Sequence, residues 1–189
     1  MTKTALITGA SKRVGLSITK HLASKGFNIA IHYNTSESDS KKIVNELKKK
    51  KIIVERFKLD LAKTDSIKSF FTRIKNHFGK IDLLVNNASV FEYDSLKSSS
   101  MKSYNKHMDI NLKAPFFLSK YFHEYLGNKK GNIINILDQR VVNLTPYFIS
   151  YTLSKSALWT LTQSLALSLA PKIRVNAIGL GPTLKSYRQ

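Results

Sequence analysis

The sequence predicts a three-layer α/β fold in which a doubly wound, mostly parallel sheet of six strands lies between two layers of helices. Short segments rich in Ile, Leu and Val alternate with longer segments of helical character along all 189 residues. Strands that are apolar on both sides are typical of a parallel sheet buried on both faces. A glycine-bearing turn at 8–15 follows the first apolar segment, as in the first unit of a Rossmann fold. We expect a single Rossmann domain over residues 1–189.

In the first half of the chain, glycines and small polar residues mark the helix ends. The first strand runs into the glycine turn and its helix, which Gly26 ends. Ser36 or Ser38 begins the second helix, and Gly79 follows the third. We expect strands at 4–10, 27–33, 52–59 and 81–86, and helices at 14–25, 36–50 and 65–78.

The second half of the chain continues the alternation with longer helices. A helical stretch at 102–126 precedes a strand at 132–137, and a long helix at 147–170 precedes a strand at 173–178. Such helices are long enough to connect one strand to the next in the same direction. We find no internal repeat, low-complexity linker or second domain.

Composition excludes several classes of protein. The chain has no cysteine, which rules out disulfides and thiolate metal sites, and we expect no metal centre. No apolar run reaches the roughly 18 residues of a membrane helix. The N-terminus leads directly into a strand, without the apolar core of a signal peptide. We therefore expect a cytoplasmic protein with no membrane partner.

The net charge of +19 raises the question of nucleic-acid binding. Of the 31 basic residues, 25 are Lys and 6 are Arg, whereas nucleic-acid sites draw heavily on the bidentate contacts of Arg. The densest run, at 48–51, falls at the expected C-terminal end of a helix, where cations suit the helix dipole. We favour a solvated basic surface over a nucleic-acid site, although polyanion binding stays the alternative.

The turn at 8–15 has the pattern of a dinucleotide site. Gly9 lets the chain turn sharply, Gly15 lets the helix pack closely, and the helix N-terminus can face a pyrophosphate. Arg13 replaces the middle glycine of the usual pattern and brings a cation to the phosphates. Residues 32–36, after the second strand, lack the acid that would bind the ribose hydroxyls of NAD, so NADP(H) is favoured. The alternative is that Arg13 is simply exposed.

The other candidate cofactor residues also follow strand ends or glycine positions, where a ligand of a parallel sheet lies. In full, the candidates are Gly9, Ser11, Arg13, Val14, Gly15, His32, Tyr33, Asn34, Thr35, Ser36, Asp60, Leu61, Asn87, Ala88, Ser89, Tyr151, Lys155 and Gly181.

Tyr151 and Lys155 are candidates for acid–base chemistry. Four residues apart on a helix, they share a face, so the ammonium is expected to lower the pKa of the phenol. The same spacing relates Tyr93 to Lys97 and Tyr125 to Lys129, so the spacing alone is weak. Only Tyr151 lies near the start of a long helix, shortly after a polar strand end at Asp138.

Together these motifs resemble the short-chain dehydrogenase/reductase family over residues 4 to about 184. The resemblance implies an NADPH-dependent oxidoreductase that transfers a hydride to a C=O or C=N bond of a small molecule. It also implies that Tyr151 supplies the proton, while Asn111 holds a water that links Lys155 to solvent. The motifs that carry it are the turn at 8–15, the turn at 86–88, Asn111, and the Tyr151/Lys155 pair.

Three replacements resemble the pteridine reductase branch of that family. Arg13 and Ser89 stand where most members have Gly, and Asp138 stands where most have Ser. The branch implies that Phe91 stacks on a pterin ring, although Phe91 could instead be a core aromatic. Thr35 departs from the branch, where a basic residue is usual. The implied catalytic residues are Asp138, Tyr151, Lys155 and Asn111, and the implied substrate-binding residues are Arg13, Phe91, Asp138 and Tyr151.

The C-terminal part departs from the family pattern. Members normally continue through a substrate lid and a seventh strand, so we expect the sixth strand to be an edge. Leu180 also replaces the Pro of a usual Pro-Gly pair. The chain is then either a shortened form of a longer enzyme or a natural truncation. In the second case it is a weak or inactive remnant that binds a dinucleotide or a partner subunit.

The resemblance also implies a homodimer. Family members commonly pair through the two helices expected at 102–126 and 147–170. Their apolar and aromatic side chains must partly cover the sheet, which is the alternative explanation of their character. Because the other usual interface needs the segment beyond the sixth strand, we expect fewer tetramers than in the family.

Overall fold

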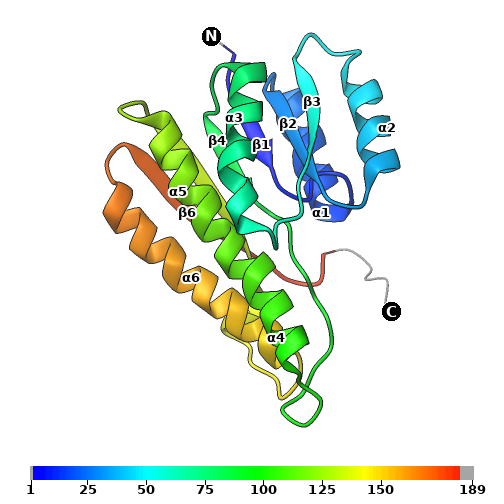
Figure 1. Ribbon diagram of the computed structural model, residues 1–189, viewed down its shortest axis with the longest axis vertical. Coiled ribbons are helices and arrows are strands. Elements are labelled where there is room, and N and C mark those ends of the chain that lie inside the picture. The colour runs from blue at the N-terminus through cyan, green and yellow to red at the C-terminus, as the bar shows by residue number, and fades with distance from the viewer. Residues whose placement is uncertain (1, 184–189) are drawn as a thin grey trace.

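Six strands form one sheet in the order β3-β2-β1-β4-β5-β6 (Figure 1). The computed structural model describes residues 2–183. Every strand pair is parallel, so the expected sheet is confirmed. Among the described strands β6 pairs with β5 alone and is an edge of the sheet. The strands are β1 (Thr4–Ile7), β2 (Asn28–Tyr33), β3 (Val54–Lys58), β4 (Leu83–Asn86), β5 (Gly131–Asp138) and β6 (Ile173–Leu180).

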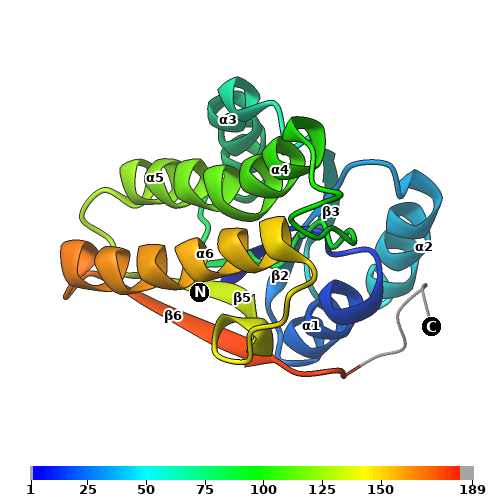
Figure 2. The same ribbon diagram turned by 90° about the horizontal axis from the view of Figure 1, so that it is seen from below.

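Helices cover both faces of the sheet and give the three expected layers. Figure 2 shows α1 and α2 on one face, and α3, α4, α5 and α6 on the other. Short 3-10 turns occur at Thr64–Ser66 and Gln139–Val141, and a π-helical segment occurs at Asp109–Lys113. The helices are α1 (Arg13–Ser24), α2 (Glu37–Leu47), α3 (Ile67–Phe78), α4 (Met101–Met108), α5 (Ala114–Leu126) and α6 (Ile149–Leu169).

Each face of the sheet has its own apolar core. Successive residues of a strand point to opposite faces, so Leu6 joins a core with Phe70 and Phe122, whereas Ile7 joins the other core with Leu47. All five side chains are fully buried. The unbroken apolar strands of the sequence are thus explained by burial on both sides.

Three expected boundaries need correction. β1 ends at Ile7 rather than at residue 10, because Gly9 already has a left-handed φ of +61°. Ser36 precedes α2 but its side chain makes no capping hydrogen bond with any described residue, and α2 ends at Leu47, so the lysine run at 48–51 lies past the helix. The helical stretch expected at 102–126 is divided by the π-helical segment.

A chain of buried polar groups crosses the sheet. Asn86 Nδ2 on β4 donates to Asn135 Oδ1 on β5 at 2.8 Å, and Asn135 Nδ2 donates to Thr162 Oγ1 on α6 at 2.8 Å. Because each buried amide needs a partner, these bonds favour one register of the two strands and one position of α6.

Within residues 2–183, no helix combines the length and apolar content that crossing a membrane requires.

Candidate active site

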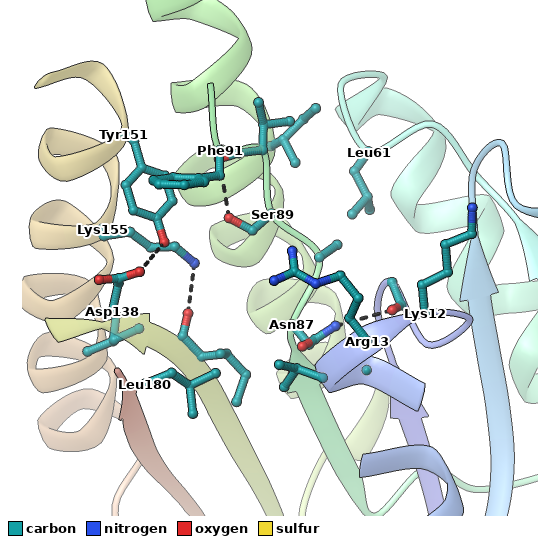
Figure 3. Close-up of a pocket in the computed structure, with 18 of the residues that line it drawn as sticks. Lys12, Arg13, Leu61, Asn87, Ser89, Phe91, Asp138, Tyr151, Lys155 and Leu180 are labelled. Atoms are coloured by element: carbon teal, nitrogen blue, oxygen red, sulfur yellow. Dashed lines mark hydrogen bonds between the residues drawn. The ribbon is translucent and has the colours of Figure 1, made fainter. Parts of the chain in front are cut away.

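A pocket of about 760 Å³ opens at the carboxyl ends of the central strands (Figure 3). Every residue that was predicted to bind the cofactor or the substrate lines it. Phe91 is among them and is 37% exposed, which excludes the alternative of a core aromatic. Asn111 is the one predicted catalytic residue outside the lining. The pocket also includes Lys12, Gln139, Arg140 and Phe148, which were not predicted.

The glycine turn is held tightly against the loop after β4. Gly9 has a φ of +61°, and a side chain at Gly15 would collide with the Gly9 carbonyl oxygen. The N–H groups of Asn87 and Ala88 both donate to Thr8 Oγ1 at 2.9 Å, and Asn87 Nδ2 donates to the Thr8 carbonyl at 2.8 Å. The two loops therefore form one rigid rim of the pocket.

Arg13 begins α1 in an unusual backbone conformation. Its φ is +48°, in the left-handed region where a side chain costs about 1 kcal/mol or more. Figure 3 shows its side chain reaching into the pocket from the side opposite Tyr151 and Lys155. Local strain of this kind persists where the surrounding structure enforces it, and it is often found at functional sites.

The turn after β2 differs in detail from its predicted role. His32 is 2% exposed, so it acts through hydrogen bonds inside the protein. The Gly9 N–H donates to His32 Nδ1 at 3.0 Å, which places the ring proton on Nε2, and Nε2 donates to the Leu59 carbonyl at 3.0 Å. His32 thus ties the glycine turn to the end of β3.

The acid nearest to this turn is engaged elsewhere. Arg56 Nη1 donates to Glu37 Oε1 at 3.2 Å and to Tyr33 Oη at 3.1 Å. Thr35 and Ser36 line the pocket and bring hydroxyls to it. The polar groups here suit an anionic substituent better than a ribose diol.

Protonation of His32 is expected to weaken the fold. Burial lowers the pKa of His32 to about 4, from an ordinary value of 6.5. Below pH 6.5 the unfolded chain binds a proton that the folded chain does not, so the free energy of unfolding falls as the pH drops toward 4. Between pH 7.5 and 5 we expect this group to remove about 2 kcal/mol, measured by denaturant unfolding.

A pair of variants isolates this effect. His32→Gln keeps a donor and an acceptor but does not titrate, so it should lose the extra acid sensitivity. His21→Gln, which changes an exposed histidine of α1, should behave like the unchanged protein. If the pH dependence of unfolding is the same in all three proteins, His32 does not control it.

Tyr151, Asp138 and Lys155 meet at the other end of the pocket (Figure 3). Tyr151 Oη donates to Asp138 Oδ2 at 2.8 Å. Lys155 Nζ donates to the Ile136 carbonyl at 2.8 Å and lies 5.7 Å from the centre of the Tyr151 ring. Tyr151 and Lys155 are 5% and 3% exposed, so α6 carries both into a dry part of the site.

The electrostatics of this cluster correct one expectation. Burial, followed by the charge and hydrogen bond of Asp138, raises the pKa of Tyr151, whereas Arg140 and Ser89 oppose the rise. The expected lowering by Lys155 is therefore wrong for this geometry. Burial lowers the pKa of Lys155 to about 8, although the Asp138 charge acts in the other direction. The phenol of Tyr151 is thus neutral at neutral pH and donates a hydrogen bond to Asp138.

The side chain of Asn111 is held by four hydrogen bonds inside the protein. It is fully buried in the π-helical segment, where Nδ2 donates to the Val90 carbonyl at 2.9 Å and to Ser154 Oγ at 3.0 Å. Its Oδ1 accepts the Val90 N–H at 2.8 Å and the hydroxyl of Ser89 at 3.1 Å. Asn111 therefore joins the loop after β4 to α6.

Two further buried side chains hold the same loop, and neither was predicted. His107 Nε2 on α4 accepts the Glu92 N–H at 3.2 Å. Asp94 is 1% exposed, its carboxylate accepts the Ser150 N–H at the start of α6, and its carbonyl accepts the Phe148 N–H at 2.7 Å. With Asn111 these residues fix the loop that carries Phe91.

Aromatic rings form one wall of the pocket. The rings of Phe91 and Phe148 stack with centroids 4.5 Å apart and 7° between planes, and Tyr151 meets the Phe91 ring edge-on at 4.7 Å. Phe148 has a left-handed φ of +58° immediately before α6. Arg140 could have been noticed in the sequence, because it follows the strand-end Asp138 by two residues.

Comparison with known proteins agrees with this geometry. The short chain dehydrogenase family matches residues 3–188. The chain belongs to this family. The 3-oxoacyl-[acyl-carrier-protein] reductase FabG of Staphylococcus aureus is 33% identical over 183 residues, which are 96% of this chain and 74% of FabG. FabG of Staphylococcus epidermidis is 32% identical over 96% of this chain and 75% of its own length.

Solved structures of FolM, described as alternative dihydrofolate reductase 1, are also similar to this short-chain dehydrogenase. FolM of Brucella suis, in complex with NADP, has a TM-score of 0.92 and 40% identity over 99% of this chain and 78% of that one. FolM of Brucella canis, also with NADP, has a TM-score of 0.92 and 39% identity, and the match covers 98% of this chain and 76% of the FolM chain. The predicted family is confirmed, and the likeness to FolM supports the pteridine reductase branch.

Proposed function

We propose that this short-chain dehydrogenase is an NADPH-dependent reductase that acts on a C=N or C=O bond of a flat ring compound such as a dihydropterin. The observation that carries the proposal is the 2.8 Å hydrogen bond from Tyr151 Oη to Asp138, beside the aromatic ring of Phe91. A carboxylate that holds a neutral phenol suits proton delivery to a ring nitrogen. The solved FolM relatives, which contain NADP, support the choice of cofactor.

The residues of the pocket fit NADP. Ser11 Oγ is buried, lines the glycine turn and has no hydrogen-bond partner among the described residues, as expected for a hydroxyl that binds a phosphate oxygen. Arg13 would add a cation at the 2′-phosphate, which the hydroxyls of Thr35 and Ser36 would also bind. Asn87, Ala88 and Lys155 would face the nicotinamide ribose end.

In the proposed reaction, residues of this chain bind and orient the substrate and supply a proton. When bound, NADPH supplies the hydride. Phe91 orients a ring by stacking. Burial and Asp138 keep Tyr151 protonated, and its hydroxyl turns from Asp138 to the substrate and gives its proton to the reduced atom. The ammonium of Lys155, fixed by the Ile136 carbonyl, stabilises the negative charge that then develops on the phenol.

A direct assay tests this proposal. NADPH oxidation is measured with a panel of dihydropterins and small carbonyl compounds, beside an NADPH-binding titration. Turnover of a dihydropterin supports the proposed function. If only the carbonyl compounds are turned over, the reaction is limited to reduction of C=O bonds. Binding without turnover of any compound supports the alternative of a non-catalytic dinucleotide-binding protein.

We also propose a homodimer formed by α5 and α6, which lie side by side on one face (Figures 1 and 2). Several large apolar side chains of these helices are exposed, including Phe116 on α5 and Leu153, Trp159 and Leu167 on α6. A stable dimer that buries these side chains would need about 1,200 Å² or more of total surface.

Light scattering with two matched variants tests the dimer. Leu167 is 84% exposed on α6, and Leu96 is 83% exposed in a loop. Leu167→Glu should shift the protein toward monomer at micromolar concentration, because two charges would face an apolar interface. Leu96→Glu should leave the dimer unchanged. A strict monomer before any substitution would refute the proposal.

A further inference from the structure

Arg140 is a cation of the pocket that the mechanism above does not use. It lies on the 3-10 turn after β5, where its backbone N–H donates to Asp138 Oδ1 at 2.9 Å. Its guanidinium donates to Thr145 Oγ1 at 2.9 Å. The guanidinium carbon lies 4.6 Å from the centre of the Phe148 ring and 5.8 Å from that of Phe91. Arg140 is therefore held beside the aromatic wall.

The charge of Arg140 is available to a ligand. It takes part in none of the ion pairs found within residues 2–183. Its side chain is half-buried, lines the pocket and is fixed by aromatic rings and a hydroxyl. A guanidinium presents its donors in a flat fork that matches a carboxylate, and its ordering beforehand reduces the entropy lost on binding.

We propose that Arg140 binds a carboxylate on the side chain of the substrate, so that the enzyme prefers a flat ring compound with an anionic tail. A ring that stacks on Phe91 has its substituents near the guanidinium, which is 5.8 Å from the centre of the Phe91 ring. Tyr151 contacts Phe91 on the same wall of the pocket. One bound molecule can therefore have its reacting ring beside Tyr151 and its anionic side chain beside the guanidinium of Arg140. This inference rests on the proposed function and specifies its substrate class.

Two substrates and three variants test the inference. The substrates are dihydrofolate, whose glutamyl group carries carboxylates, and a dihydropterin with an uncharged side chain. Arg140→Gln should raise the KM for dihydrofolate about 10-fold or more and should change the KM for the uncharged compound less than about 2-fold. Arg140→Lys should restore part of the preference. Arg174→Gln is the control, because Arg174 binds Asn132 on the exposed side of β6.

Binding is measured in parallel, so that the two proposals can fail separately. Folate and an uncharged pterin are titrated by calorimetry into each protein saturated with NADP⁺. If neither substrate is turned over but folate binding weakens only in Arg140→Gln, the proposed reaction fails and the anion site stands. Equal effects on both compounds would show that Arg140 only supports the loop at 139–147. Unchanged folate affinity in Arg140→Gln would overturn the inference as well.

Discussion

Replacing Tyr151 with Phe is expected to reduce turnover by about 10²–10⁴-fold while NADPH still binds. The ring contacts with Phe91 and His107 stay, and only the hydroxyl that donates to Asp138 is lost. Steady-state rates on a verified substrate and an NADPH titration measure the two effects separately. Full activity of this variant would remove Tyr151 from the mechanism.

Tyr125→Phe is the matched control for this experiment. Tyr125 also lies four residues before a lysine, Lys129, but its hydroxyl donates to the Gly79 carbonyl at 2.9 Å, and it does not line the pocket. Loss of this bond should leave the rate unchanged. The comparison therefore separates the position of Tyr151 in the pocket from a spacing that recurs in a lysine-rich chain.

The pH profile adds a second readout to the same prediction. Because burial lowers the pKa of Lys155 to about 8, its ammonium is present below that pH and is lost above it. Turnover should therefore fall as the pH rises through about 8, since the charge that stabilises the phenolate disappears. The pKa of Tyr151 is raised, so Tyr151 itself stays protonated across this range.

The second large effect is expected at Arg13. Arg13→Ala should weaken NADPH binding by about 10–100-fold with little change for NADH, because one charge-assisted contact with phosphate is worth roughly 1.5–3 kcal/mol. Titration of both cofactors gives the ratio of affinities. Lys20→Ala, which removes an exposed charge of α1 paired with Glu46, is the control for net charge. Equal affinity of the unchanged protein for the two cofactors would contradict the argument.

Arg13→Gly separates the charge of this side chain from its backbone strain. Glycine adopts the φ of +48° without steric cost, so this variant should raise the free energy of unfolding by about 1 kcal/mol. Arg13→Ala keeps the strained conformation and should not. Both variants should lose the preference for NADPH to the same extent. A cofactor ratio that changed in only one of them would show that conformation, rather than charge, sets the preference.

Local patterns were sufficient to predict the sheet and most of the pocket lining. Apolar strands, glycine turns and polar strand ends depend on the chain within a few residues, and parallel strands bring their ends together by topology. For this reason Gly9, Arg13, Phe91 and Tyr151 were found from the sequence although they are far apart in it. Arg140 could have been predicted in the same way, because it follows the end of a strand by two residues.

Contacts between distant segments were not predictable in the same way. His32 has the position of a cofactor ligand, and only the fold shows that its two nitrogens bind Gly9 and Leu59. Asp94 reaches Ser150, which is 56 residues away, and neither has a local pattern. The direction of the Tyr151 pKa depends on Asp138 and on burial, so spacing to Lys155 could not give it.

The hydrogen bonds that hold the loop after β4 fix the position of Phe91 relative to α6. Asn111 and Asp94 join this loop to α6, so a displacement of the helix that carries Tyr151 would carry Phe91 with it. The contact between the rings of Phe91 and Tyr151 is therefore maintained by the fold. Under the proposed function, a flat ring is therefore expected to bind against this wall more tightly than a bulky, puckered one.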